Sequence, residues 1–284
     1  MKKNALLLAL LLGGVSLTVS GQKYGKLLPE MPGVQTYTFR VAMAKDVPGT
    51  LDKIKAMGFT NIEGGAPRGV TTTEFKAMLD ARGIRCTSTG AGYDALADEA
   101  KTAEVIKNAK ILGAEFIMTA WIPHKGAFDL ATAQKAVADF NRAGKQFKEA
   151  GLTFCYHNHG YEFEKHEDGT LFDYIAKNTD PNYVSFEIDI LWTFFPGQDP
   201  AALINKYPTR FKLMHMKDLK KGVEGNMTGG TPQENDVVLG TGQLDIPAIL
   251  KAARKSAIKY YYIEDESPQP DAQVPQTLAY LKGL

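Results

Sequence analysis

The sequence predicts an α/β protein, a single-domain (β/α)₈ barrel of the TIM type. Eight short apolar runs alternate with longer segments whose apolar residues recur with a helical period. At several junctions a glycine ends the helical segment and leads directly into the next apolar run. A chain of about 260 residues remains after an N-terminal leader, which is a usual length for one such barrel.

The eight apolar runs are the predicted strands, and the segments between and after them are the predicted helices. The runs begin near Val34, Thr60, Ile84, Phe116, Thr153, Val184, Phe211 and Tyr260. The helices are predicted over 47–57, 72–81, 95–112, 130–150, 171–177, 200–207, 246–254 and 272–281. An open doubly wound sheet is the alternative, but no glycine-rich dinucleotide loop follows the first run.

The N-terminus has the features of a secretory signal peptide over residues 1–21. Lys2 and Lys3 precede an apolar stretch over 5–12, and small residues precede Gln22. The barrel is then expected over 22–284, in an exported protein that is periplasmic or extracellular and free of the membrane after cleavage. An uncleaved N-terminal anchor is the alternative interpretation of the same segment.

The composition argues against a nucleic-acid partner, because a formal net charge of +1 lacks the basic excess that such a surface needs. Cys86 and Cys155 both lie within apolar runs. We therefore expect buried free thiols, with a disulfide as the alternative that export would permit.

Ionisable residues gather where four of the later strands should end. His157 and His159 follow the fifth run, and the alternation of a strand places Glu187 and Asp189 on one face of the sixth. The seventh and eighth runs lead to His215, Lys217 and Glu264. Taken singly, a strand-capping histidine pair, a core histidine or a solvated acidic turn would explain them. Their conjunction at one rim instead indicates a divalent metal site, and mixed imidazole and carboxylate ligands suit Mn, Co, Zn or Fe.

Five segments carry a resemblance to a known family. They are 153–163 (TFCYHNHGYEF), 185–192 (SFEIDILW), 211–218 (FKLMHMKD), 238–245 (VLGTGQLD) and 261–266 (YYIEDE). Together these segments resemble the xylose-isomerase-like barrels, which are often called sugar phosphate isomerases/epimerases. The likeness covers nearly all of the predicted barrel and is specific for the family, but not for a substrate.

The resemblance implies one divalent metal ion held by four ligands, namely His157, Asp189, His215 and Glu264. His157 stands where many members carry a glutamate, which places the usual two-glutamate proton shuttle in doubt. Glu187 or Glu162 is a candidate for the missing carboxylate. Trp192 stands where many members carry a substrate-contacting histidine.

The expected function is a metal-dependent sugar isomerase or epimerase that moves a proton through an enediolate, on a non-phosphorylated sugar or keto-sugar. The candidate bases are Glu264, His159 and Glu162, and Lys217 is placed to hold a substrate oxygen. The expected substrate-binding residues are Tyr37, Glu63, Trp121 and Trp192.

Two other functions compete with this expectation. A metal-dependent lyase or dehydratase on a keto-sugar or 3-keto-glycoside would lose a β-oxygen from the same intermediate. A non-catalytic exported sugar-binding barrel would have lost its metal ligands, but three ligand positions keep the residue types that the resemblance implies. In each case the partner is a small sugar or polyol, and the sequence leaves open whether the chain forms a homo-oligomer.

Overall fold

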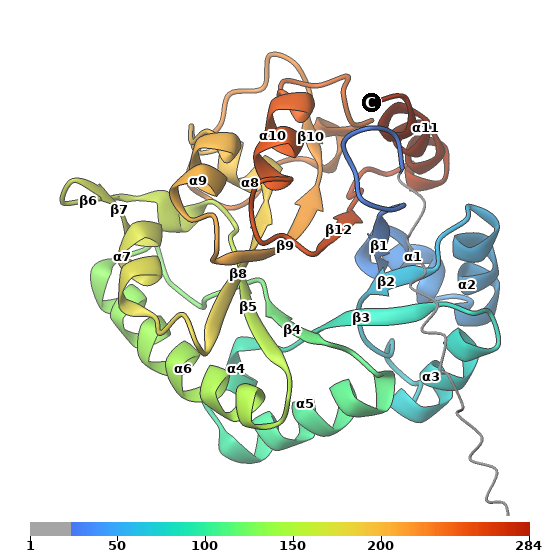
Figure 1. The fold of residues 1–284 in the computed structure, drawn as a ribbon, viewed down its shortest axis with the longest axis horizontal. Helices are drawn as coiled ribbons and strands as arrows, with labels where there is room; N and C mark the ends of the chain where they lie inside the picture. Colours follow the sequence, from blue (N-terminus) through green and yellow to red (C-terminus); the bar gives the residue numbers. More distant parts are fainter. Residues whose placement is uncertain (1–23) are drawn as a thin grey trace, which may run out of the picture.

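Eight parallel strands close into a barrel in the computed structural model, which describes residues 24–284 (Figure 1). They are β1 (Gly33–Gln35), β2 (Asn61–Glu63), β3 (Arg85–Gly90), β4 (Phe116–Thr119), β5 (Thr153–His157), β8 (Val184–Asp189), β9 (Phe211–Met216) and β12 (Tyr260–Ile263). Chain neighbours pair side by side, and β1 closes the barrel by pairing with both β2 and β12. The predicted single-domain (β/α)₈ barrel and all eight predicted strands are confirmed.

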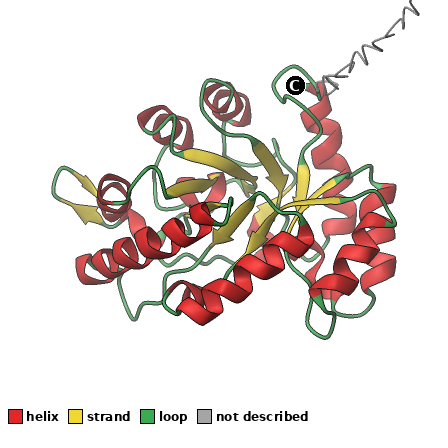
Figure 2. Cartoon of the chain, turned by 60° about the horizontal axis from the view of Figure 1, so that its bottom comes forward, coloured by secondary structure: helices red, strands yellow, loops and turns green. Residues whose placement is uncertain are grey.

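Helices form an outer ring around these strands (Figure 2). They are α1 (Arg40–Met43), α2 (Val47–Ala56), α3 (Thr72–Asp80), α4 (Tyr93–Leu96), α5 (Glu99–Leu112), α6 (Leu130–Glu149), α7 (Leu171–Asn178), α8 (Ile190–Phe194), α9 (Pro200–Lys206), α10 (Ile246–Ala253) and α11 (Pro270–Gly283). The eight predicted helices are all present. The short helices α1, α4 and α8 were not predicted, because four or five residues are too few to show a helical period.

Local signals explain where the helices begin and end. The prediction started one helix at residue 95, but α5 begins only at Glu99, because the side chain of Asp98 caps it by accepting a hydrogen bond from the amide of Lys101. At its other end Gly113 takes the left-handed conformation, with φ of 73°. A residue without Cβ adopts this conformation at little cost, so the chain can turn directly into β4.

The two faces of the strands pack into different cores. A large cluster joins the outward side chains of the strands to the helices, and includes Ile117, Phe154 and Met214. The neighbouring residues along the same strands, Phe116 and Cys155 among them, form a separate inner cluster. Because successive strand residues point to opposite faces, this second cluster fills the barrel interior. Both cysteines are buried and free, as predicted.

The segment after β9 is a long loop whose two ends pair with each other. Its ends pair as the antiparallel strands β10 (Asp218–Leu219) and β11 (Asp236–Val237). A second small ribbon, β6 (Lys165–His166) with β7 (Gly169–Thr170), precedes α7. The carboxylate of Asp218 accepts four backbone hydrogen bonds, from residues 219, 240, 242 and 244.

The predicted signal peptide, residues 1–21, lies outside the described residues. Within residues 24–284, no helix combines the length and apolar character needed to cross a bilayer.

Candidate active site

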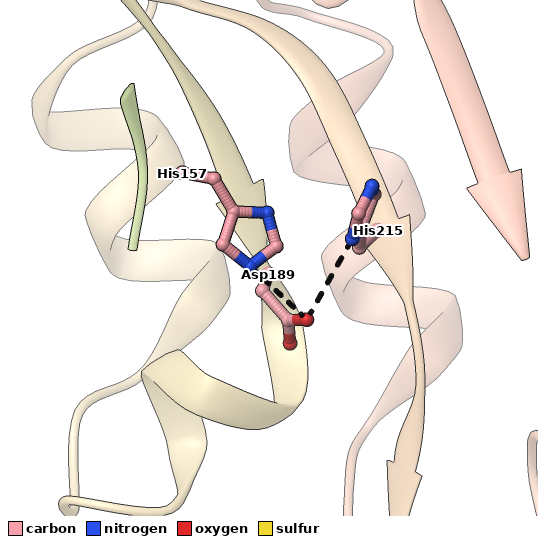
Figure 3. A group of neighbouring side chains, drawn as sticks. All are labelled: His157, Asp189 and His215. Atoms are coloured by element: carbon pink, nitrogen blue, oxygen red, sulfur yellow. Dashed lines mark ion pairs between the residues drawn. The ribbon is translucent and has the colours of Figure 1, made fainter. Parts of the chain in front are cut away.

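Three ionisable side chains meet at the carboxyl end of the barrel (Figure 3). His157 is the last residue of β5, Asp189 the last of β8, and His215 lies opposite Asp189 in β9. Since β5, β8 and β9 are adjacent strands, the three side chains converge without any loop rearrangement. Asp189 Oδ2 lies 3.7 Å from His157 Nε2 and 3.9 Å from His215 Nδ1.

Glu264, one residue past β12, brings a second carboxylate to the group. Its Oε2 lies 3.0 Å from His215 Nδ1. Four atoms held about 2.0–2.2 Å from a tetrahedral zinc ion are separated by roughly 3.4 Å, close to the spacing of these donors. Asp189 Oδ2 is buried and accepts no hydrogen bond from any described residue. The donor set, its spacing and this buried oxygen, which makes no hydrogen bond and has the Lys217 ammonium within ion-pair distance, fit a divalent metal ion.

Lys217 supplies a positive charge beside these carboxylates. Its Nζ lies 3.3 Å from Asp189 Oδ2 and 2.8 Å from Glu264 Oε2, and it also contacts the carboxylate of Glu266. Burial raises the pKa of Glu264, but Lys217 and His215 outweigh burial and hold this pKa well below its usual range. Burial also raises the pKa of Asp189, and there it prevails over the opposing effect of Lys217.

The two imidazoles experience different surroundings. Burial, followed by the nearby His215, lowers the pKa of His157 well below its usual value, so this ring is neutral and can act as a ligand. Burial would also lower the pKa of His215, but the carboxylates of Glu187 and Glu264 outweigh it and raise this pKa strongly. The same negative field would attract a divalent cation to the site.

A second layer of carboxylates lies beneath the donor atoms. Glu187 Oε2 lies 3.1 Å from His157 Nδ1, and its Oε1 lies 3.3 Å from His215 Nε2. Glu63 Oε1 lies 2.5 Å from the same His215 nitrogen and accepts a hydrogen bond from Gln35 Nε2. The side chains of Glu63 and Glu187 are completely buried. His157 therefore presents Nε2 to the site, while Glu187 contacts the opposite nitrogen of the ring.

Asn158 joins the two strands that carry His157 and Asp189. Its Oδ1 accepts a hydrogen bond of 3.0 Å from the amide of Asp189, and its Nδ2 donates to the Asp189 carbonyl and to Thr193 Oγ1. These bonds continue the pairing of β5 and β8 beyond the end of β5. Sequence reasoning did not single out Asn158, although its place between two histidines at a strand end was a usable signal.

A cavity of about 1060 Å³ opens above the donor atoms. From β5, β9 and β12 and the residues just after them, its lining is His157, His159, His215, Lys217, Glu264 and Glu266. The ends of β1 to β4 and α1 provide its apolar side chains, which are Tyr37, Met43, Ala44, Pro67, Met118 and Ala120. Arg40 and Arg68 also face it. Of these apolar and arginine side chains only Tyr37 was predicted to bind substrate, because all of them except Met118 in β4 lie in loops or in short helical turns.

Six of the predicted site residues are absent from the described lining of this cavity, namely Glu63, Trp121, Glu162, Glu187, Asp189 and Trp192. Glu162 is completely buried behind the cavity wall, where its carboxylate accepts hydrogen bonds from the Tyr156 hydroxyl and the His159 amide. These contacts hold the Glu162 carboxylate outside the described lining, so its assignment as a catalytic base stays a prediction that no contact to the cavity supports. Glu63 is likewise absent from the described lining, because it lies one layer below, against His215.

The predicted aromatic residues lie at the edge of the site. Trp192 stacks against His159, with ring centroids 4.8 Å apart, and its ring lies 5.6 Å from Lys217 Nζ. Trp121 is 42% exposed and stacks on His124. The described cavity lining includes neither tryptophan. Burial lowers the pKa of His159 to about 4, so its imidazole is neutral.

Comparison with solved structures confirms the architecture. A protein described as a sugar phosphate isomerase/epimerase from Parabacteroides distasonis ATCC 8503 is 27% identical, with a TM-score of 0.74 over 95% of this chain and 96% of its own. The structure of a protein called IOLI, described with a bound zinc atom, is 12% identical over 88% of this chain and 95% of its own, with a TM-score of 0.65. At that identity the likeness shows the fold alone.

Curated relatives and a family profile add sequence evidence. An inosose dehydratase from Lacticaseibacillus casei is 24% identical over 145 residues, which are 48% of each chain. The chain thus spans about half the length of this relative. A profile described as "Xylose isomerase-like TIM barrel" matches residues 51–284, which include every proposed metal donor. The chain therefore belongs to the xylose isomerase-like TIM barrel family.

Proposed function

We propose that the protein is a metal-dependent lyase that removes a β-oxygen substituent from a keto-sugar or 3-keto-glycoside. His157, Asp189, His215 and Glu264 would hold one divalent ion of Mn, Co, Zn or Fe. When bound, this ion would supply Lewis-acid polarisation of the substrate carbonyl. The name of the dehydratase relatives supports a reaction of the elimination class.

One observation carries the choice of elimination. On the ionisable side of the cavity, Glu264 is the only glutamate among the proposed donors, because His157 stands at the end of β5. Two glutamates on either side of a substrate can pass a proton between neighbouring carbons or between faces. With an imidazole in place of one of them, the cavity retains a neutral base at His159 and an ammonium acid at Lys217.

These two side chains have complementary roles in an elimination. The His159 imidazole takes the proton from the carbon beside the carbonyl, and the electrons of that C–H bond form a C=C bond. The bond from the neighbouring carbon to its oxygen substituent breaks, and Lys217 donates a proton to the departing oxygen. Trp192 packs against both His159 and Lys217 and so holds them on one wall.

An isomerase or epimerase is the second candidate. The protein from Parabacteroides distasonis, which aligns along nearly its whole length, carries that description. In that reaction His159 would remove the same proton. A proton would then return to the neighbouring carbon or to the other face of the same carbon, and no carbon–oxygen bond would break.

Mass spectrometry in D₂O separates these reactions. The metal-loaded protein is incubated with free keto-sugars and with 3-keto-glucosides. A lyase releases water or aglycone and leaves an unsaturated sugar, whereas an isomerase or epimerase returns a product of unchanged formula that carries solvent deuterium. We expect Asp189→Ala to lose both bound metal and activity, and His159→Gln to keep the metal but lose activity. Retention of activity in Asp189→Ala, or no metal in the wild type after reloading, would refute the proposal.

Export is part of the same proposal, because the leader over residues 1–21 resembles a signal peptide. Sequencing of the mature N-terminus from fractionated cells is expected to begin near Gln22. A protein that retains Met1 in the cytoplasmic fraction would contradict it.

A further inference from the structure

The two halves of the cavity lining differ in chemistry. Every lining residue from β5 onwards is ionisable, whereas the half built by β1 to β4 and the segment around α1 combines apolar side chains and glycines with Gln35, Thr36, Arg40 and Arg68. Since β1 to β4 are neighbours in the closed barrel, these residues form one continuous wall opposite the ionisable wall. A substrate that was polar at every edge would leave the apolar wall without a partner.

The apolar half is also open, because glycines stand where side chains would narrow it. Gly64, Gly65 and Gly90 all line it. A Cβ at Gly90 would meet no atom within 4 Å, so the space above it is free. Gly64 has φ of 149° and a Cβ there would lie 2.0 Å from Thr36 Oγ1, which keeps this position without a side chain.

An aromatic ring stands at the entrance to this half. Tyr37 is 50% exposed, and the Arg40 guanidinium lies 4.7 Å from the centre of its ring. Arg40 is itself held by hydrogen bonds of 3.2 Å to the Tyr37 carbonyl and 2.9 Å to the Glu266 carbonyl. A ring and a guanidinium that are fixed in this way form a ready surface for another aromatic ring.

The volume agrees with a substrate larger than one sugar. Pockets that enclose drug-sized ligands measure roughly 300–1,000 Å³. At about 1060 Å³ the cavity lies just above that range, and a single hexose at the ionisable wall would leave the apolar half unfilled.

We propose that the substrate is a glycoside with an aromatic aglycone, with the sugar at the ionisable wall and the aglycone against Tyr37, Met43, Ala44 and Met118. This inference rests on the proposed function, which places the reacting sugar beside the metal donors. The departing oxygen is then the glycosidic oxygen. The carbon it leaves forms a C=C bond with the neighbouring deprotonated carbon, and the released phenol or alcohol carries the proton from Lys217.

Binding of matched glycosides tests the assignment. Titration calorimetry with metal-loaded protein compares methyl and phenyl β-D-glucosides, together with their 3-keto forms. Burial of a phenyl ring is expected to lower the dissociation constant by about tenfold or more. Ala44 is exposed and lines the open half, so the larger side chain of Ala44→Trp should occupy the aglycone space and abolish the phenyl preference. Ala44→Met should have an intermediate effect.

Val41→Trp is the matched control, because Val41 lies in α1, which ends one residue before Ala44, is 63% exposed and is absent from the described cavity lining. Equal affinity for methyl and phenyl glycosides, no binding of either, or a phenyl preference that survives Ala44→Trp would overturn the inference. If cellobiose bound as tightly as the phenyl glycoside, the apolar half would accept a second sugar as well as an aromatic ring. That result would also overturn the inference. The metal content and the products formed in D₂O show separately whether the proposed function stands.

Discussion

Glu187 offers a sharp test of the donor arrangement. Its carboxylate lies 3.1 Å from His157 Nδ1 and 3.3 Å from His215 Nε2, so one side chain supports two of the four proposed donors. Glu187→Ala removes both contacts, whereas Glu187→Gln keeps one acceptor oxygen and nearly the same volume. If His157 is the donor and Glu187 supports it, both variants should still bind the metal ion, but more weakly than the wild type.

The size of the loss follows from the contacts. A hydrogen bond to a charged group contributes about 1.5–3 kcal/mol, and 1.4 kcal/mol corresponds to about a tenfold change in affinity. Loss of an outer partner of a metal-bound histidine weakens binding by about 10–100-fold. Because Glu187 contacts two imidazoles, we expect about 100-fold for Glu187→Ala and about 10-fold for Glu187→Gln.

Competition with a chelator measures the dissociation constant of Co²⁺, and the visible absorption of bound Co²⁺ reports its ligands. Glu162→Gln is the matched control, since Glu162 is also a completely buried glutamate but lies outside the cavity, and its metal affinity should be unchanged. Wild-type affinity in Glu187→Ala would refute the supporting role. A changed Co²⁺ spectrum in Glu187→Gln, with an intact spectrum in His157→Ala, would instead identify Glu187 as the fourth donor.

Three further predictions concern stability and the long loop. Phe140→Ala should cost about 3–5 kcal/mol in the free energy of unfolding by denaturant, because this completely buried ring packs on Phe154; a loss below 1 kcal/mol would contradict that packing. Gly229→Val should lower the melting temperature and alter the site, because Gly229 has φ of 68° and its Cβ would lie 3.0 Å from the His159 carbonyl oxygen; unchanged melting and activity would show that the loop is free of His159. Burial opposes ionisation of Asp173, but hydrogen bonds from neighbouring side chains outweigh it and lower its pKa. The stability that Asp173 adds over Asp173→Asn should thus be complete above about pH 4 and disappear as pH falls further, and an advantage that persists at pH 2 would exclude this account.

The sequence alone was sufficient for the architecture and for grouping most of the proposed metal donors. Strand and helix periods are local properties, so the eight runs and the helices between them could be recognised without any long-range information. In a parallel barrel all strands end at one face, which is why His157, Asp189 and His215 could be grouped from their places at strand ends. The choice between His157 and Glu187 stayed open, because alternation gives the face of a side chain but not its height within the barrel.

Only the tertiary structure determined how deep each side chain lies in the barrel and which loop residues line the cavity. The depth of each side chain along the barrel axis placed Glu187 and Glu63 below the donors, and a turn after β5 directed Glu162 behind the wall. Apart from Met118 in β4, the apolar side chains of the cavity come from short loops and from helical turns that are too short to show a period. Such side chains are brought together only when distant segments pack, because burial depends on the whole closed barrel rather than on neighbours in the chain.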